Sequence, residues 1–192
     1  TYVLEVSSYQ LELMEKIKPN IAILTNLSSD HLERHGTYKD YVKSKEKIFM
    51  NQDSSDLAII NTDTKEGEKI YKTLKSKING PNIIRISINN KFKKSVYLKN
   101  GKIINSLGKK NKSLGKVKEI TSLLGEHNIE NILISLSAVL SYGLSHKQIN
   151  AYLPKFKTLP HRIEELGTKK NIKFINDSKS TNLVSSSVAL DC

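Results

Sequence analysis

Short runs of apolar residues alternate along this chain with segments in which apolar residues recur every three or four positions. The apolar runs span residues 2–6, 21–27, 57–60, 82–88 and 172–175, and the amphipathic segments span residues 38–50, 65–78, 127–142 and 147–156. Nearly continuous apolar runs are typical of strands that are buried on both faces of a parallel sheet. The pattern therefore predicts an α/β fold in which helices flank a mostly parallel sheet.

One segment departs from this alternation. Apolar residues at positions 96–98 and 103–104 flank the dipeptide Asn100-Gly101. Asn-Gly between two apolar runs is typical of the type I′ turn of a β-hairpin. We therefore expect a small antiparallel hairpin beside the parallel sheet. We also expect Pro154 to end or kink the last helix.

Composition narrows the classes of protein. The chain of 192 residues contains one cysteine, Cys192, which excludes a disulfide framework and a multi-thiolate metal site within the chain. No apolar run reaches the roughly 18 residues that a membrane span needs. These features predict a single cytoplasmic domain without membrane insertion. Because the chain opens with Thr1 directly before an apolar run, we expect it to be a fragment.

The formal net charge of +12 raises the question of a polyanion partner. Among the 31 basic residues only Arg34, Arg85 and Arg162 are arginines, and the lysines are dispersed along the chain. The densest run, residues 109–118, contains no aromatic residue that could stack on a base. We predict a solvated loop there and no nucleic-acid partner. A polyanion-binding module remains the alternative from a different class.

Polar clusters follow three of the apolar runs. Residues 5–10 follow the first run, Asn26 and Asp30-His31 follow the second, and residues 176–182 follow the last. In open α/β sheets, ligands bind beyond the carboxyl ends of the strands. We therefore expect the clusters to converge on one site. Glu5 and His31 suit a divalent cation that handles phosphates, although a structural hydrogen bond explains either residue alone.

Lys45 occupies an unusual position in the amphipathic segment 38–50. Thr37 and Asp40 predict the start of a helix at this segment. Lys45 lies in the middle of its apolar stripe, which consists of Tyr38, Tyr41, Val42, Ile48 and Phe49. Burial disfavours the ammonium form, so an inward lysine would have a lowered pKa and a nucleophilic amine. The alternative is a lysine whose stem packs on the stripe while its amine reaches solvent.

Two further features combine polar groups with a predicted element end. Asn128 and Asn131 lie on the first turn of the segment 127–142, off its apolar stripe. Arg162 follows Leu159-Pro160-His161 in a short connector. The amides can cap the helix or bind a ligand, and the guanidinium can form a surface ion pair or clamp a phosphate.

Taken in order, these motifs resemble the Mur ligases. The resemblance rests on residues 5–12, Asn26 with residues 30–35, Tyr41 with Lys45, residues 125–131, residues 159–162 and residues 176–182. Each motif is weak alone, but six in one order are specific, and together they cover almost the whole chain. The opening Glu-Val-Ser-Ser-aromatic-Gln favours the members that add D-glutamate to UDP-N-acetylmuramoyl-L-alanine in peptidoglycan synthesis.

The resemblance implies a role for each matching residue. Mg²⁺ would be held by Glu5, His31 and Lys45, with Lys45 carbamylated by CO₂, and His31 and Lys45 would serve in catalysis. ATP would be bound by Asn128, Asn131, Arg162 and Asp177. The muramoyl and D-glutamate substrates would be bound by Ser7, Gln10, Lys179 and Thr181. The implied reaction is ATP-driven amide formation through an acyl phosphate.

The resemblance also implies how the chain is organised. Residues 1–182 would be most of a central ATP-binding domain, and residues 183–192 would begin its next helical segment. The chain contains no G-x-x-x-x-G-K-[ST] phosphate loop, which the family has upstream of the matching segment. We therefore expect the fragment alone to be inactive, and the full-length protein to be a monomeric bacterial enzyme.

The nearest rival is another ATP-dependent amide ligase of the same superfamily, such as a folylpolyglutamate synthase. The motif of that family after the first strand is glycine-rich, whereas this chain has Ser7-Ser8-Tyr9-Gln10.

Overall fold

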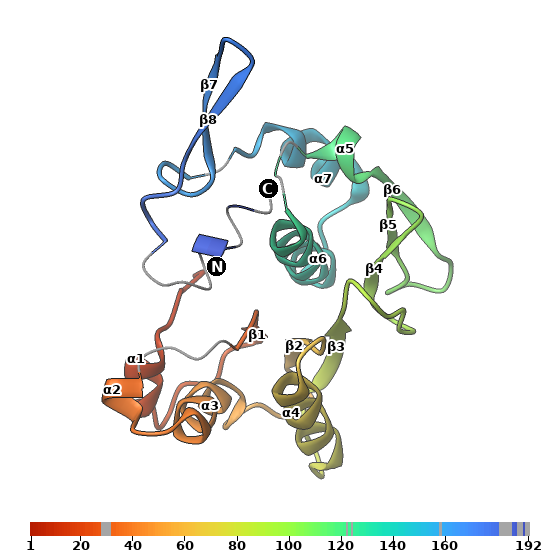
Figure 1. Ribbon diagram of the computed structural model, residues 1–192. Helices are drawn as coiled ribbons and strands as arrows, with labels where there is room; N and C mark the ends of the chain where they lie inside the picture. The colour runs from red at the N-terminus through yellow and green to blue at the C-terminus, as the bar shows by residue number, and fades with distance from the viewer. Residues whose placement is uncertain are drawn as a thin grey trace.

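The computed structural model describes residues 1–27, 32–121, 123, 125–157, 159–180, 186–187 and 190. Its central element is a three-stranded parallel sheet in the order β1-β2-β3 (Figure 1). The strands are β1 (Ile21–Leu24), β2 (Leu57–Asn61) and β3 (Asn82–Ile86). In their register, Ile59 of β2 pairs with Ile23 on one side and with Ile84 on the other. Three of the predicted apolar runs are thereby confirmed as parallel strands of an α/β fold.

Helices cover both faces of this sheet. One face carries α1 (Ser8–Glu12), α2 (Leu32–His35), α3 (Tyr38–Glu46), the 3-10 helix η1 (Lys47–Phe49) and α4 (Lys65–Ser76), and the other carries α6 (Glu126–Ser141). Successive side chains of a strand point to opposite faces. Ala58 and Ile60 therefore pack in one core with Phe49 and Ile70, whereas Ile59 packs in a second core with Leu133 of α6.

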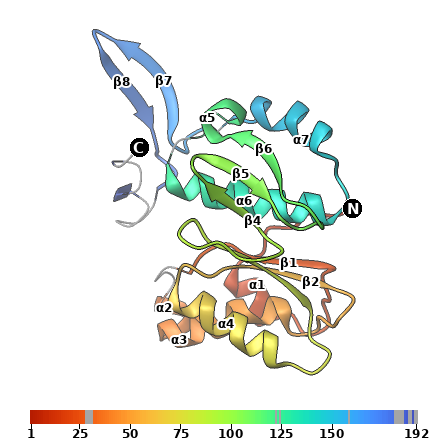
Figure 2. The ribbon, with the colours of Figure 1, turned by 90° about the vertical axis from the view of Figure 1, so that its right-hand side faces the viewer.

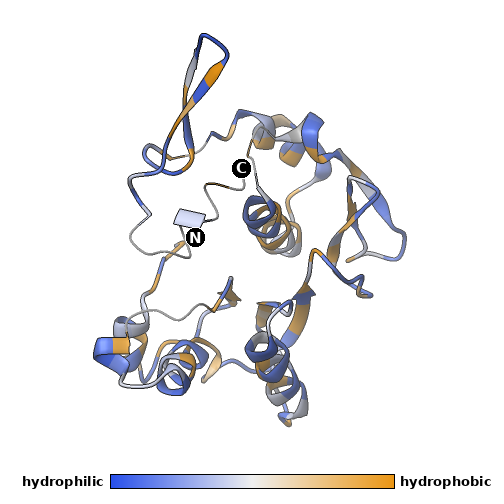
Figure 3. Ribbon diagram, in the orientation of Figure 1, coloured by the Kyte–Doolittle hydropathy of each residue, from blue (hydrophilic) through white to orange (hydrophobic). Residues whose placement is uncertain are grey.

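Hydropathy follows this layering. Figure 3 shows that β3 is largely orange, whereas the helices α3 and α4 carry much more blue. Burial of the strands on both faces explains why they appear as nearly continuous apolar runs in the sequence. None of the helices in the described part of the chain is both long and apolar enough to cross a membrane.

Two predicted helix boundaries are confirmed. The Thr37 hydroxyl accepts a hydrogen bond from the backbone N–H of Asp40 at 3.2 Å and caps α3. At the other boundary, α7 (His146–Tyr152) ends two residues before Pro154 and continues as the 3-10 helix η2 (Leu153–Lys155). Proline lacks the N–H that a longer α-helix would need at this position.

A second, antiparallel sheet contains β4 (Val96–Lys99), β5 (Lys102–Asn105) and β6 (Lys112–Lys116). Asn100 and Gly101 have φ values of 50° and 70°, as a type I′ turn requires, so the predicted hairpin is confirmed. The prediction of a loop over residues 109–118 is wrong, because this stretch contains β6 and the start of α5 (Val117–Ile120). The open edge of β5 supplies the backbone partners for β6.

The predicted strand 172–175 forms, but it does not join the parallel sheet. It is part of β8 (Ile172–Asn176), which pairs with β7 (Glu164–Lys169) in a separate antiparallel hairpin that projects from the body of the molecule (Figure 2). Lys170 and Asn171 have φ values of 50° and 61°, which makes the connection a tight two-residue turn. This local turn pairs β8 with its sequence neighbour instead of with a distant parallel strand.

The prediction of a strand at residues 2–6 is wrong. This segment is irregular, and Tyr2 and Val3 are 94% and 92% exposed. A strand is stable only where its backbone pairs with a neighbour. In the described part of the chain, residues 2–6 pair with no strand, and β1 remains an edge strand of the sheet.

Candidate functional site

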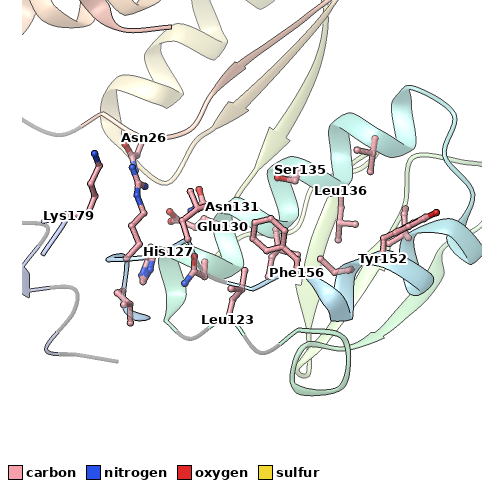
Figure 4. Close-up of a pocket in the computed structure, with 18 of the residues that line it drawn as sticks. Asn26, Leu123, His127, Glu130, Asn131, Ser135, Leu136, Tyr152, Phe156 and Lys179 are labelled. Carbon is pink, nitrogen blue, oxygen red and sulfur yellow. The ribbon is translucent and has the colours of Figure 1, made fainter. Parts of the chain in front are cut away.

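A cavity of about 950 Å³ lies between α6, α7 and the loops that follow β1 and β8. Its polar lining consists of Asn26, His127, Asn128, Glu130, Asn131, Ser135, Gln148, Arg162, Asp177, Lys179 and Ser180. Figure 4 shows Asn26 and Lys179 at one end and Leu136, Tyr152 and Phe156 toward the other. A polar end and an apolar end within one cavity suit a ligand that has a charged part and a flat apolar part.

The first turn of α6 supplies one wall of the cavity. Gly125 precedes the helix with a φ of 87°, a conformation that glycine adopts without a Cβ clash. Leu133, which is fully buried, anchors the opposite side of α6 in the core. Residues three and four positions apart share one face of a helix. His127, Glu130 and Asn131 therefore lie together on the side that faces the cavity (Figure 4).

Arg162 and Lys179 reach the cavity from two loops that are tied together by Asp177. One carboxylate oxygen of Asp177 accepts a hydrogen bond from the backbone N–H of Ile163 at 3.0 Å, and the other accepts from the Ser180 hydroxyl. The backbone N–H of Lys179 donates to the carbonyl of His161 at 3.0 Å. Asp177 thus fixes the two cationic residues relative to each other.

Two ionisable groups on α6 have shifted pKa values. Burial lowers the pKa of His127, and the charge of Asp177 opposes this shift. Burial raises the pKa of Glu130 against a hydrogen bond to Asn61, and the charge of Asp63 adds to the rise. Both shifts favour the neutral forms of these groups. Arg162 and Lys179 supply positive charge to the lining of the cavity.

The structure brings together five residues that the sequence places in separate motifs. Asn128, Asn131, Arg162 and Asp177, predicted for ATP, and Lys179, predicted for substrate, all line this one cavity. Thr181 lies outside the described residues, as do His31 and, apart from residues 186–187 and 190, the segment 183–192.

The remaining predicted residues lie elsewhere. Lys45 is half-buried on α3, with its Nζ 5.8 Å from the ring centroid of Tyr41, while Glu5 is exposed in the irregular segment before α1. Ser7 and Gln10 bond to each other in the capping box that begins α1. Among the described residues there is no group of three or more His, Cys, Asp or Glu side chains that could hold a metal. Because His31 is not among them, the Mg²⁺ site stays a prediction.

Two residues with distinct environments were not assigned a role by sequence reasoning. Glu130 stands three positions after His127, and this spacing could have placed it on the same side of the helix. His35 falls within the motif at residues 30–35, yet nothing in the pattern indicates that its side chain is only 1% exposed. Its burial is a property of the tertiary structure.

Comparison with known proteins assigns the chain to a family. A family model described as the Mur ligase middle domain matches residues 1–139. The UDP-N-acetylmuramoylalanine–D-glutamate ligase of Elusimicrobium minutum is 38% identical over 188 residues, which are 98% of this chain and 39% of that protein. The ligase of the same name from Phenylobacterium zucineum is 34% identical over 181 residues, which are 94% of this chain and 38% of that protein.

Solved structures show the same fold at lower identity. MurF from Acinetobacter baumannii superposes with a TM-score of 0.71 at 18% identity, over 96% of this chain and 38% of that chain. A MurF ligase from Thermotoga maritima superposes with a TM-score of 0.62 at 17% identity, over 97% of this chain and 42% of that chain. The chain thus spans about 40% of the length of the proteins that it matches.

The α/β fold and the matching family model agree on one class of domain. This chain belongs to the Mur ligase family, with the fold of its middle domain. Within the family, the curated relatives matched over nearly the whole chain carry the name of the D-glutamate ligase. Membership of a ligase family decides against the polyanion-binding module.

Proposed function

We propose that this chain is the nucleotide-binding part of an ATP-dependent ligase that joins D-glutamate to UDP-N-acetylmuramoyl-L-alanine. The similarity to ligases of that name over 94% to 98% of the chain supports the choice of substrates. The observation that carries the proposal is the cavity, because five residues from three separate motifs line it. We also propose that the full-length protein acts as a monomer in the bacterial cytoplasm, where ATP is available.

The two ends of the cavity suit the two parts of ATP. Arg162 presents a planar fork that can donate two hydrogen bonds to one phosphate, and Lys179 adds a point charge. Tyr152 and Phe156 lie at the apolar end, where a base can stack. The MurF ligase of Thermotoga maritima, which has this fold, was solved in complex with ADP. We assign the phosphates to the polar end and the adenine to the apolar end.

Glu5, His31 and a carbamylated Lys45 are the residues that we propose to hold Mg²⁺. Carboxylate, imidazole and carbamate donors suit a cation that also binds phosphate oxygens. The half-buried position of Lys45 on α3 leaves part of its side chain open to CO₂. When bound, the cation neutralises charge on the phosphates.

The proposed reaction has two steps. A carboxylate oxygen of the muramoyl-alanine attacks the γ-phosphorus of ATP, ADP leaves, and an acyl phosphate forms. The amine of D-glutamate then attacks the acyl carbon, loses a proton and expels inorganic phosphate, which leaves the amide. In both steps Arg162 and Lys179 orient phosphate groups and neutralise their charge.

The choice of amino acid tests this proposal. The full-length protein should release ADP in the presence of UDP-N-acetylmuramoyl-L-alanine and D-glutamate, and it should not accept L-lysine or meso-diaminopimelate in place of D-glutamate. Acceptance of either of these instead of D-glutamate would assign the protein to another branch of the family. ATP turnover that needs no muramoyl substrate would contradict the ligase proposal itself.

A further inference from the structure

A buried histidine joins α1 to α2 through both of its ring nitrogens. The His35 side chain is 1% exposed, and its Nδ1 lies 2.8 Å from Oε1 of Glu12. Its Nε2 lies 2.9 Å from Oγ of Ser8. Ser8 and Glu12 are four residues apart, so they lie on the same face of α1 and present both partners to one ring. A single side chain thus holds two helices in register.

This Ser8-His35-Glu12 arrangement has the residue types of a hydrolase triad but not its accessibility. Ser8 is 1% exposed, so its hydroxyl cannot reach a substrate carbonyl in this structure. A triad is recognised by the roles that its geometry permits and not by residue types alone. The hydrogen bonds of His35 therefore fix the position of its ring against the side chains that it contacts.

The neighbours of His35 include Tyr41, whose ring lies near the amine of Lys45. The His35 ring stacks on Tyr9 with a centroid distance of 5.5 Å and packs edge-on against Tyr41 at 5.5 Å. Tyr41 is buried on α3, and the Nζ of Lys45 lies 5.8 Å from its ring centroid. Figure 1 shows α1, α2 and α3 beside one another on one side of the molecule. The ring of Tyr41 therefore contacts both the Lys45 amine and the His35 ring.

We propose that His35 is a positioning residue for Lys45. It holds the ring of Tyr41, and through that ring the Lys45 amine, in a fixed position relative to α1, the helix that Ser7 caps and that contains Gln10. This inference rests on the proposed function, which makes Lys45 the carrier of a carbamate. In carbamate formation the lone pair of the neutral amine forms a bond to the carbon of CO₂, one C=O electron pair moves to oxygen, and the amine proton passes to solvent. A misplaced amine would hold its carbamate less well.

The test uses His35→Gln and Ser8→Ala in the full-length enzyme. Ser8→Ala removes only the partner of Nε2 and keeps the ring, so it tests the inference even if His35→Gln folds poorly. The matched control is His146→Gln. His146 is half-buried and, like His35, hydrogen-bonded through Nε2, to Asn105 at 3.0 Å, but it lies on α7, far along the chain from Lys45.

The first readout is the carbamate itself, observed by ¹³C NMR in ¹³C-bicarbonate, and the second is the bicarbonate concentration that gives half-maximal activity. We expect His35→Gln to raise that concentration about tenfold, as is typical when a residue that supports a ligand is removed. Ser8→Ala should raise it less, and His146→Gln should leave it unchanged. The KM for ATP should stay the same in all three variants.

Each outcome has a defined meaning. A wild-type enzyme without a carbamate signal refutes the proposed role of Lys45, and the inference about His35 with it. A wild-type enzyme with the signal, whose His35→Gln and Ser8→Ala variants lose thermal stability but keep the wild-type bicarbonate dependence, refutes the inference alone, because His35 then serves only in packing.

Discussion

Replacement of Asp177 should weaken ATP binding at the proposed nucleotide site. Its carboxylate accepts hydrogen bonds from the backbone N–H of Ile163 and from the Ser180 hydroxyl. The first bond joins the loop that carries Arg162 to the loop that carries Lys179, and the second lies within the loop that carries Lys179. Asp177→Ala removes both bonds and leaves only the backbone bond from Lys179 to His161 between the two loops, so the two cations should be held less firmly even though neither is changed.

The size of the effect follows from the two lost bonds. Hydrogen bonds to charged groups each contribute about 1.5–3 kcal/mol when they are well shielded from water. Asp177 is half-buried, so we take about 2 kcal/mol for the pair together. If ATP needs both loops in place, this cost weakens ATP binding by about 30-fold. Asp177→Asn keeps an oxygen acceptor for Ile163, so its loss should be about fivefold.

Isothermal titration of the full-length protein with ATP measures both losses. Asp53→Ala is the matched control, because Asp53 accepts similar bonds from the backbone N–H and hydroxyl of Ser55, at 2.9 and 2.7 Å, but does not line the cavity. It should leave the Kd for ATP unchanged. Wild-type affinity in Asp177→Ala, in a protein shown by circular dichroism to be folded, would refute the idea that Asp177 organises the site.

Two further predictions concern Lys45 and Glu130. Lys45→Ala should abolish most activity of the full-length enzyme, and acetate should partly restore it. Lys43→Ala, at an exposed position, should be nearly neutral. Equal mild losses of activity in both variants without rescue by acetate would refute the carbamate assignment. The pKa of Glu130 is raised above 4.5, so the folded protein binds more protons than the unfolded chain and its stability falls as pH rises from 4.5 through the raised value. Urea unfolding from pH 4 to 7 should show that the free energy of unfolding falls less with pH in Glu130→Gln than in the wild type. It should fall as in the wild type in Glu15→Gln, a substitution at an exposed residue. A wild-type pH dependence of the free energy of unfolding in Glu130→Gln would contradict this.

Local signals in the sequence determined the elements whose formation depends on nearby residues. The apolar runs that became β1, β2 and β3 are separated by helices, which is the order that a parallel sheet requires. Asn100-Gly101 set the first hairpin, Thr37 capped α3, and Pro154 ended α7. The motifs also indicated the ligase family, because the order of several short polar clusters is itself a property of the sequence.

Only the tertiary structure decided which strands pair and which polar groups meet. A short apolar run does not specify its partner, so residues 2–6 and 172–175 were both predicted for the parallel sheet, while the first stayed irregular and the second joined β7. The meeting of Asn131, Arg162 and Lys179 in one cavity depends on how α6 packs and how Asp177 ties two loops together. The burial of His35 depends on contacts between three helices. Such contacts join residues that are distant along the chain, and for that reason no local pattern records them.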